Sequence, residues 1–304
     1  MKLAIIGPGA LGTFLAGILG KDHDILLLGR RDVDLNSVRV SGNTTVECEV
    51  EYTTDASKLT RYQYILLCTK SYDTEQAVEE IHPYINNDAR VVSLQNGLNN
   101  ELLISKYVDP HKIIGGVTSQ GITYESLGHV IHAGEGDTYI GLYPHGKDEY
   151  VSRFAEFLRN TVLEVEVVDN IYGYIWQKVI VNACINPLTA LTGLKNGALL
   201  EDQELRGLME KICHESHSVA IKETTLPNDD PLREVERVAS LTAENRSSML
   251  QDIQRHRKTE IDCINGAVVD MAKKIGIETP LNHMLYALIK GRELYFKQKT
   301  TGKN

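Results

Sequence analysis

The stretch KLAIIGPGALG at residues 2–12 decides the fold. The short apolar run over residues 2–6 is typical of a buried strand. The pattern G-x-G-x-x-G follows over residues 7–12, and small apolar residues over 10–19 then favour a helix. A glycine loop that joins a strand to a helix is the confirming context for a dinucleotide-binding fingerprint.

Each glycine of this loop has its own task. Gly7 permits the tight turn, Gly9 lets a pyrophosphate approach the backbone, and Gly12 lets the helix pack close to the strand. The helix N-terminus offers free N–H groups and a partial positive charge to the phosphates. We therefore assign cofactor binding to Gly7, Pro8, Gly9, Ala10, Leu11 and Gly12. The alternative is a plain strand–turn–helix without a ligand.

The end of the second expected strand, at residues 24–28, indicates which nucleotide binds. NAD-specific sites usually carry Asp or Glu there, bound to the ribose hydroxyls. This chain has Gly29, Arg30 and Arg31 instead. Because a guanidinium group suits a 2′-phosphate through charge-assisted hydrogen bonds, the sequence favours NADPH, with Arg30 at its phosphate. The alternative is that both arginines are solvated surface charges.

Apolar runs alternate with helical patterns through the first half of the chain. The expected strands are 2–6, 24–28, 64–68, 90–94 and 113–117, and the expected helices include 10–19 and 74–82. Strands that alternate with helices indicate βαβ units and a parallel sheet. Two stretches of alternating residues, 38–53 and 128–141, predict an antiparallel hairpin and late antiparallel strands that extend the sheet.

The pattern changes after a strand-like segment at residues 165–168. Helices are then expected over 171–192, 204–225, 232–239, 249–275 and 283–298. We therefore predict an α/β protein with two domains. Residues 1–168 form an NADP-binding, Rossmann-type, mostly parallel sheet with helices, and residues 169–304 form an all-helical substrate and catalytic domain.

The stretch WQKVIVNACINP at residues 176–187 is the most informative part of the second half. Lys178, Asn182 and Asn186 are spaced four residues apart, so they lie along one face of a helix. Their neighbours are almost all apolar, and a polar ligand would offset the cost of burying them. Pro187 is expected to kink or end the helix. Alternatively, the lysine reaches solvent and the asparagines cap loops.

A second polar run lies at residues 245–262. One of the serines Ser247 and Ser248 is expected to cap a helix. Glu260 is expected within the helix over 249–275, among apolar neighbours, where its carboxylate could pair with Lys178. Spacing alone favours an ordinary glutamate on the helix surface.

Two polar residues follow expected strands of the first domain. Lys70 comes after the strand at 64–68, and Asn96 after the strand at 90–94. The carboxyl ends of parallel strands border the ligand crevice, so both side chains are placed to meet cofactor or substrate. Turn residues without a ligand contact are equally compatible with these positions.

Composition restricts the class of protein. The 304 residues carry a net charge of −9, which disfavours nucleic acid as a partner. Hydrophobic residues make up 42%, typical of a globular chain, and no apolar stretch approaches the length of a membrane span. The five cysteines include no CxxC pair, which indicates reduced thiols in the cytoplasm. We expect no metal and leave the oligomeric state open, a homodimer included.

Taken together, these motifs resemble those of the ketopantoate reductases (2-dehydropantoate 2-reductases) over nearly the whole chain. The resemblance rests on GPGALG, CTKSYDT around Lys70, QNG at 95–97, WQKVIVNACINPLTAL and SSMLQDIQRHRKTEIDCINGAVV. It implies a Rossmann domain followed by a helical domain. It also implies NADPH-dependent reduction of 2-dehydropantoate to (R)-pantoate, a step in pantothenate and coenzyme A synthesis.

The resemblance also implies roles for individual residues. Lys178 matches the catalytic lysine of the family, and Glu260 matches the glutamate that binds substrate and orients that lysine. The positions that match substrate contacts are Asn96, Asn182, Asn186 and Ser248. Lys70 matches a lysine near nicotinamide and substrate, Asn96 is also expected at the cofactor, and Arg30 matches the arginine at the 2′-phosphate.

Two other classes of function remain open. One is a related NADP-dependent reductase of another 2-keto acid, such as a hydroxyacid or opine-type dehydrogenase. The other is a nucleotide sensor without catalysis, which would have no need of Lys178 and Glu260.

Overall fold

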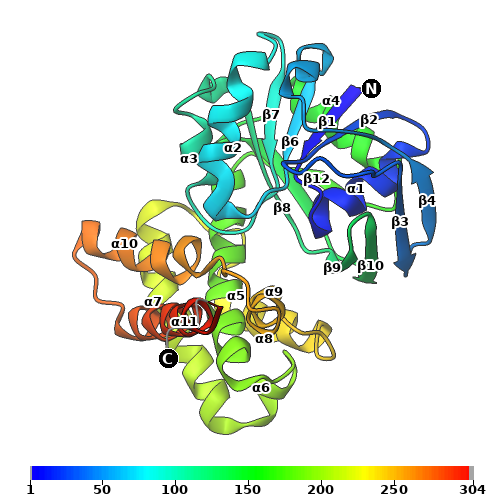
Figure 1. The fold of residues 1–304 in the computed structure, drawn as a ribbon. Coiled ribbons are helices and arrows are strands. Elements are labelled where there is room, and N and C mark those ends of the chain that lie inside the picture. The colour runs from blue at the N-terminus through cyan, green and yellow to red at the C-terminus, as the bar shows by residue number, and fades with distance from the viewer. Residues whose placement is uncertain (1, 301–304) are drawn as a thin grey trace. The chain divides into compact units, whose positions relative to one another are not determined.

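The computed structural model describes residues 2–300, in two compact units (Figure 1). The first unit contains the chain up to Gln95 together with Asn100–Tyr172, and the second contains Asn96–Asn99 and the chain from Gly173 onward. The sequence places the domain boundary at residue 168, whereas the contacts divide the chain after Tyr172. The sequence gives no sign that the short segment Asn96–Asn99 packs with the helical unit.

An eight-stranded sheet organises the first unit. Its strands are β1 (Lys2–Ile6), β2 (Asp24–Leu28), β5 (Glu51–Thr53), β6 (Tyr64–Leu67), β7 (Arg90–Ser93), β8 (Ile113–Thr118), β11 (Thr138–Leu142) and β12 (Val165–Val167). Their order is β12-β11-β8-β7-β6-β1-β2-β5, and every neighbouring pair is parallel except β8 with β11. The mostly parallel α/β sheet predicted from the sequence is confirmed.

Both faces of this sheet are buried, which explains the continuous apolar runs of its strands. In β1, Leu3 and Ile5 pack into one core cluster, and Ala4 and Ile6 pack into another. Two helices contribute to the first cluster, α1 (Ala10–Gly20) and α4 (Glu149–Arg159). Two others contribute to the second, α2 (Thr74–Ile81) and α3 (Asn100–Ile104). Helices therefore cover both faces of the sheet.

A smaller four-stranded sheet corrects one expectation. It has the order β4-β3-β10-β9, with strands β3 (Ser37–Gly42), β4 (Val46–Glu49), β9 (Gly121–Ser126) and β10 (His129–Gly134). The predicted hairpin is present, because β3 and β4 are antiparallel. Of the late strands, however, only β11 extends the large sheet. Burial alternates along β10, so this strand has one buried face and suits a sheet that is covered on one side.

All the regular secondary structure among the described residues of the second unit is helical. Its helices are α5 (Ile171–Thr192), α6 (Ala198–Glu201), α7 (Gln203–Glu223), α8 (Pro231–Leu241), α9 (Ser248–Gln254), α10 (Asn265–Ile275) and α11 (Pro280–Thr300). The helical second half predicted from the sequence is confirmed. Within residues 2–300, no helix combines the length and the apolar character that crossing a membrane requires.

The helix α5 covers Ile171–Thr192, as the sequence predicts, and continues through Pro187. Of the two effects expected of Pro187, a kink or an end of the helix, the end is therefore wrong. A proline inside a helix leaves the carbonyl four residues earlier without its usual amide donor. Here that carbonyl belongs to Ala183, and the side-chain amide of Asn265 donates to it at 3.2 Å. A side chain of α10 thus replaces the hydrogen bond that Pro187 cannot make.

The expected helix over 249–275 is also wrong, because two helices occupy this stretch. The first, α9, ends at Gln254, and α10 begins at Asn265. Between them His256 has a φ of 54°, a left-handed conformation that interrupts a helix. Glu260 therefore lies outside any α-helix, directly before the 3₁₀ turn η5 (Ile261–Cys263).

A buried carboxyl group, Glu101 in α3, stands out in the first unit. Glu101 is 2% exposed, and the Ser93 hydroxyl hydrogen-bonds to the Glu101 carboxyl group. Burial raises the pKa of Glu101 to about 7, because the charged form loses its hydration.

This shifted pKa predicts a pH-dependent stability. The pKa of Glu101 is higher in the folded protein than in the unfolded chain. The folded protein is therefore most stable below the unfolded-state pKa, and it loses stability as the pH rises through about 7. At high pH the ionised carboxylate lowers the free energy of unfolding by about 3 kcal/mol. We expect Glu101→Gln to resist urea better than the wild type at pH 9, with the difference disappearing near pH 5. The control Glu149→Gln alters an exposed carboxylate. Equal pH dependence in all three proteins would contradict the prediction.

Candidate active site

The glycine loop has the geometry that a dinucleotide needs. Gly7 has a φ of 106°, and a Cβ on Gly12 would overlap the Gly7 carbonyl oxygen. Gly9 is the N-cap of α1 and has no side chain to occupy the helix end, and the first turn has no acidic residue. The first turn's N–H groups face this end of the helix, so the loop fits a pyrophosphate.

The predicted phosphate ligand follows β2 in the same unit. The Arg30 guanidinium lies 3.3 Å from a carboxylate oxygen of Asp73, and both side chains are partly exposed. An exposed ion pair of this kind contributes little, so it competes weakly with a phosphate. Lys70, at the end of β6, is partly buried and directly precedes the 3₁₀ turn that contains Asp73.

Three predicted residues lie in α5 of the second unit. Lys178, Asn182 and Asn186 share one face of the helix, as their spacing predicts. Asn186 is 6% exposed, and the other two are partly buried. The side-chain nitrogen of Asn182 is buried and has no hydrogen-bond partner among residues 2–300. A buried donor of this kind is costly unless a ligand accepts its hydrogen bond.

The charge state of Lys178 is set by two opposed effects. Burial lowers the pKa of Lys178 to about 8, and the Glu260 carboxylate raises it. The sequence leaves open which effect is larger, and the structure shows that burial is. A lysine with such a pKa exchanges its proton near neutral pH, as a general acid must.

Glu260 lies beside Asn96, and both residues belong to the second unit. The Asn96 side-chain nitrogen donates to a Glu260 carboxylate oxygen at 3.4 Å. The next residues of this segment pack on η5, because the Leu98 N–H donates to the Cys263 carbonyl at 2.9 Å. A Cβ on Gly97, whose φ is 88°, would lie 2.7 Å from Cys263, so only glycine allows this approach. Glu260 itself is 6% exposed.

The two serines before α9 have different surroundings. Ser247 is buried and is the N-cap, with its hydroxyl accepting from the Leu250 N–H at 3.1 Å. It also hydrogen-bonds to the Thr189 hydroxyl at 2.7 Å. Ser248 is exposed at the first position of the helix. The capping role thus belongs to Ser247, which leaves the Ser248 hydroxyl available.

The predicted residues therefore divide between the units. The second unit holds Asn96, Lys178, Asn182, Asn186, Ser248 and Glu260, while the first holds the glycine loop, Arg30 and Lys70. Sequence reasoning missed two buried amides of the second unit, Gln177 and Asn196, which have unpaired polar atoms among the described residues. The Asn196-Gly197 dipeptide looks like an ordinary turn, and Gln177 looks like a polar residue of the exposed helix face.

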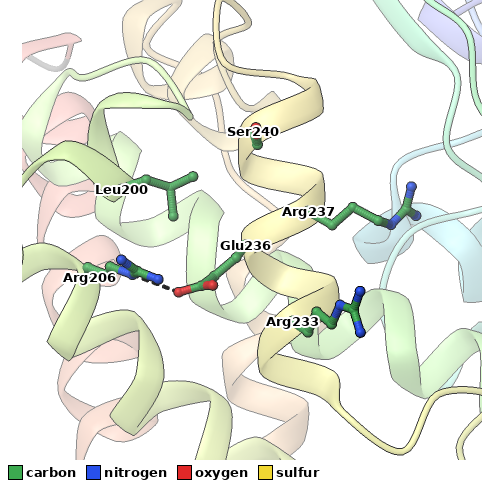
Figure 2. A pocket seen from close by; sticks show the side chains of 6 residues that line it. All are labelled: Leu200, Arg206, Arg233, Glu236, Arg237 and Ser240. Atoms are coloured by element: carbon green, nitrogen blue, oxygen red, sulfur yellow. Dashed lines mark hydrogen bonds and ion pairs between the residues drawn. The ribbon is translucent and has the colours of Figure 1, made fainter.

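A pocket of about 370 Å³ in the second unit is a different feature. It lies between α7 and α8 and is lined by Leu200, Arg206, Arg233, Glu236, Arg237 and Ser240 (Figure 2). Arg206 pairs with Glu236 at 2.7 Å, and Arg237 pairs with Glu234 at 2.7 Å. None of the predicted site residues lines it, and at least two of its three arginines already have carboxylate partners.

Comparisons with known families agree with this division of the chain. Residues 3–145 match the family model described as ketopantoate reductase PanE/ApbA, and residues 170–293 match the model of its C-terminal part. The chain belongs to the ketopantoate reductase family. Members of this family are NAD(P)-dependent oxidoreductases, so the chain is an enzyme of that class.

Individual relatives cover nearly the whole chain. A 2-dehydropantoate 2-reductase from Pyrococcus horikoshii is 36% identical over 298 residues, which are 96% of this chain and 98% of the relative. The structure of a PanE/ApbA family ketopantoate reductase from Ralstonia eutropha JMP134 has a TM-score of 0.89 at 29% identity, covering 98% of this chain and 100% of that one. A D-mandelate dehydrogenase with NADH and anilino(oxo)acetate has a TM-score of 0.90 at 26% identity, with the same coverage.

The two serines provide a matched test of the local geometry. We expect Ser247→Ala to lower the free energy of unfolding by about 1–2 kcal/mol, because the variant loses a helix cap. The control Ser248→Ala removes an exposed hydroxyl and should change it by less than about 0.5 kcal/mol. Urea unfolding measures both. Equal losses in the two variants would mean that Ser247 is not the cap.

Proposed function

We propose that the protein catalyses the NADPH-dependent reduction of 2-dehydropantoate to (R)-pantoate, a step toward pantothenate and coenzyme A. The observation that carries the proposal is Lys178, whose pKa is lowered to about 8 by burial and which lies under the influence of Glu260. Polar side chains on the same face of α5 provide contacts for a small polar substrate.

The reduction needs a hydride and a proton. A nicotinamide cofactor held by the glycine loop and Arg30 would supply the hydride, and the chain's own residues would stabilise the charge and supply the proton. As the carbonyl bond opens, negative charge develops on its oxygen. The Lys178 ammonium stabilises that charge and donates its proton to the oxygen, which leaves the lysine neutral. Glu260 favours the protonated lysine at the start of each turnover.

Amide and hydroxyl groups hold the substrate. The unpaired amide nitrogen of Asn182 suits an acceptor such as the substrate carboxylate. Asn186 extends the same face by one helical turn, and Ser248 offers an exposed hydroxyl. Asn96 lies beside Glu260 and contacts substrate and cofactor in this proposal.

The first unit supports the choice of cofactor. Its glycine loop fits a pyrophosphate, and Arg30 takes the 2′-phosphate in place of its weak pairing with Asp73. Lys70 lies at the carboxyl end of β6, where the ligand crevice of such sheets is found. All five cysteines are free thiols, which supports the cytoplasmic location that we also propose.

A second candidate is reduction of another 2-keto acid. The similarity to a protein named D-mandelate dehydrogenase favours keeping it, because that protein shares the fold at a TM-score of 0.90. A panel of 2-keto acids, with loss of NADPH absorbance as the readout, decides between the two. We expect ketopantoate to have the highest kcat/KM. A higher value for an aromatic keto acid would favour the second candidate, and NADPH binding without any turnover would indicate a sensor.

The Arg30 assignment predicts a cofactor preference. Charge-assisted contacts to a phosphate contribute roughly 1.5–3 kcal/mol, so NADPH should bind about ten- to a hundredfold more tightly than NADH. Arg30→Ala should remove most of this preference and leave NADH affinity unchanged. Arg153→Ala, which alters an exposed arginine of α4, is the control. Equal affinities of the wild type for the two cofactors would refute the assignment.

The proton-donor role predicts both a rate and a pH profile. Lys178→Ala should lower kcat by about 10²- to 10⁴-fold, the usual range for general acids. In the wild type only the protonated lysine donates, so kcat/KM should fall as pH rises through about 8. Glu260→Gln removes the neighbour that favours the ammonium, so this fall should begin at lower pH.

Two measurements serve as controls for this prediction: the NADPH affinity of Lys178→Ala and the KM of Glu260→Ala. NADPH affinity should be nearly the same in Lys178→Ala, and Glu260→Ala should raise KM more than Glu260→Gln, since Gln keeps hydrogen-bonding atoms. Coincident basic limbs in the wild type and both Glu260 variants, with unchanged KM, would assign Glu260 to an ordinary structural position.

A further inference from the structure

A buried carboxylate on α11, Glu293, holds the residue that precedes Glu260. Glu293 is 6% exposed, and one of its oxygens accepts two hydrogen bonds from Thr259. The backbone N–H of Thr259 donates at 2.7 Å, and the Thr259 hydroxyl donates at 2.7 Å. Thr259 has no exposed surface. Hydrogen bonds to a charged acceptor are among the strongest in proteins, so this pair fixes Thr259 firmly.

The same threonine extends this anchor to the other side of Glu260. Its hydroxyl oxygen accepts from the Ile261 N–H at 3.3 Å while the hydroxyl proton goes to Glu293. The Glu260 carbonyl in turn accepts from the Cys263 N–H at 3.0 Å. The main chain is therefore held on both sides of Glu260, starting from one carboxylate on α11.

A lysine of α11 completes the arrangement. Lys290 lies 3.3 Å from the second oxygen of Glu293 and 3.0 Å from a carboxylate oxygen of Asp262. Lys258 lies 3.9 Å from the same Asp262 oxygen. The Lys290 ammonium therefore pairs with both Glu293 and Asp262, and the two carboxylates tie residues on both sides of Glu260 to α11.

Glu260 needs such an anchor because its carboxylate is buried. A buried carboxylate gains free energy by turning toward water unless its main chain prevents it. Arg255–Lys258, which precede Thr259, are exposed and form no helix, so no regular secondary structure fixes the chain on that side. Three of these four residues carry positive charge, and hydration favours keeping them in solvent.

We propose that Glu293 is a positioning residue of the active site: through Thr259 it keeps the Glu260 carboxylate beside Asn96 and within electrostatic reach of Lys178. This inference rests on the proposed function. Glu293 contacts neither Lys178 nor substrate in this role and acts only through the chain that carries Glu260.

The test is a double-variant cycle between Glu293 and Glu260. We expect Glu293→Ala to raise KM, to lower kcat about ten- to a hundredfold, and to move the basic limb of kcat/KM to lower pH. In the Glu260→Gln background, Glu293→Ala should change these values little further, because the effects of substitutions at residues that act together do not add. Glu293→Gln keeps an oxygen for Thr259 and should recover part of the loss.

A matched control separates positioning from stability. Asp230 is another carboxylate of the second unit that holds the main chain, since it caps α8 by accepting a hydrogen bond from the Arg233 N–H at 3.0 Å. Asp230→Ala should lower stability, yet its effect on kcat should add to that of Glu260→Gln and its basic limb should stay in place.

Amide hydrogen exchange gives a readout that does not depend on activity. Glu293→Ala should speed exchange over residues 255–263, and Asp230→Ala should not. If the wild type reduces a 2-keto acid but the Glu293 and Glu260 effects add, the positioning role is wrong while the proposed function stands. If the wild type reduces none, the proposed function fails, and unchanged exchange at 255–263 in Glu293→Ala would overturn the anchor as well.

Discussion

The proposed chemistry depends on keeping one ammonium group, that of Lys178, charged where burial opposes charge. Burial alone favours the neutral lysine, and the Glu260 carboxylate opposes this, with a resulting pKa of about 8. The attraction between the two groups weakens as the distance between them grows, so both have to be held in place. Hydrogen bonds from other helices hold the helix that carries the lysine and the turn that carries the glutamate.

The helix α5 illustrates how such a hold works. Pro187 directly follows Asn186, the last polar residue of the face that also bears Lys178 and Asn182, and it removes one main-chain hydrogen bond. The Asn265 amide supplies the missing donor to the Ala183 carbonyl, and it also donates to the Asn282 side chain at 3.0 Å. Three helices thus meet at the Asn265 amide, and α5 continues for five more residues after the proline.

Regular, local patterns allowed most of the fold to be predicted from the sequence. The parallel strands, the glycine loop and the face of α5 follow from burial period and spacing, and they lie where expected. The helix expected over 249–275 is broken after Gln254, where His256 is left-handed, and a contact across the unit, from Glu293 to Thr259, holds the segment that follows. No local pattern in the sequence reveals that contact. For the same reason the sequence could not show that Asn96 packs with the helical unit, although Gly97 is the residue that permits it.

Two buried carboxyl groups have similar exposure but different neighbours. Glu101 and Glu260 are 2% and 6% exposed. Glu101 has a serine hydroxyl for a neighbour, and burial raises its pKa to about 7, so part of it is neutral at physiological pH. Glu260 instead faces an amide donor and acts on an ammonium group. Only a charged Glu260 can favour the protonated Lys178. The chemistry therefore requires that the two groups be held together before substrate arrives.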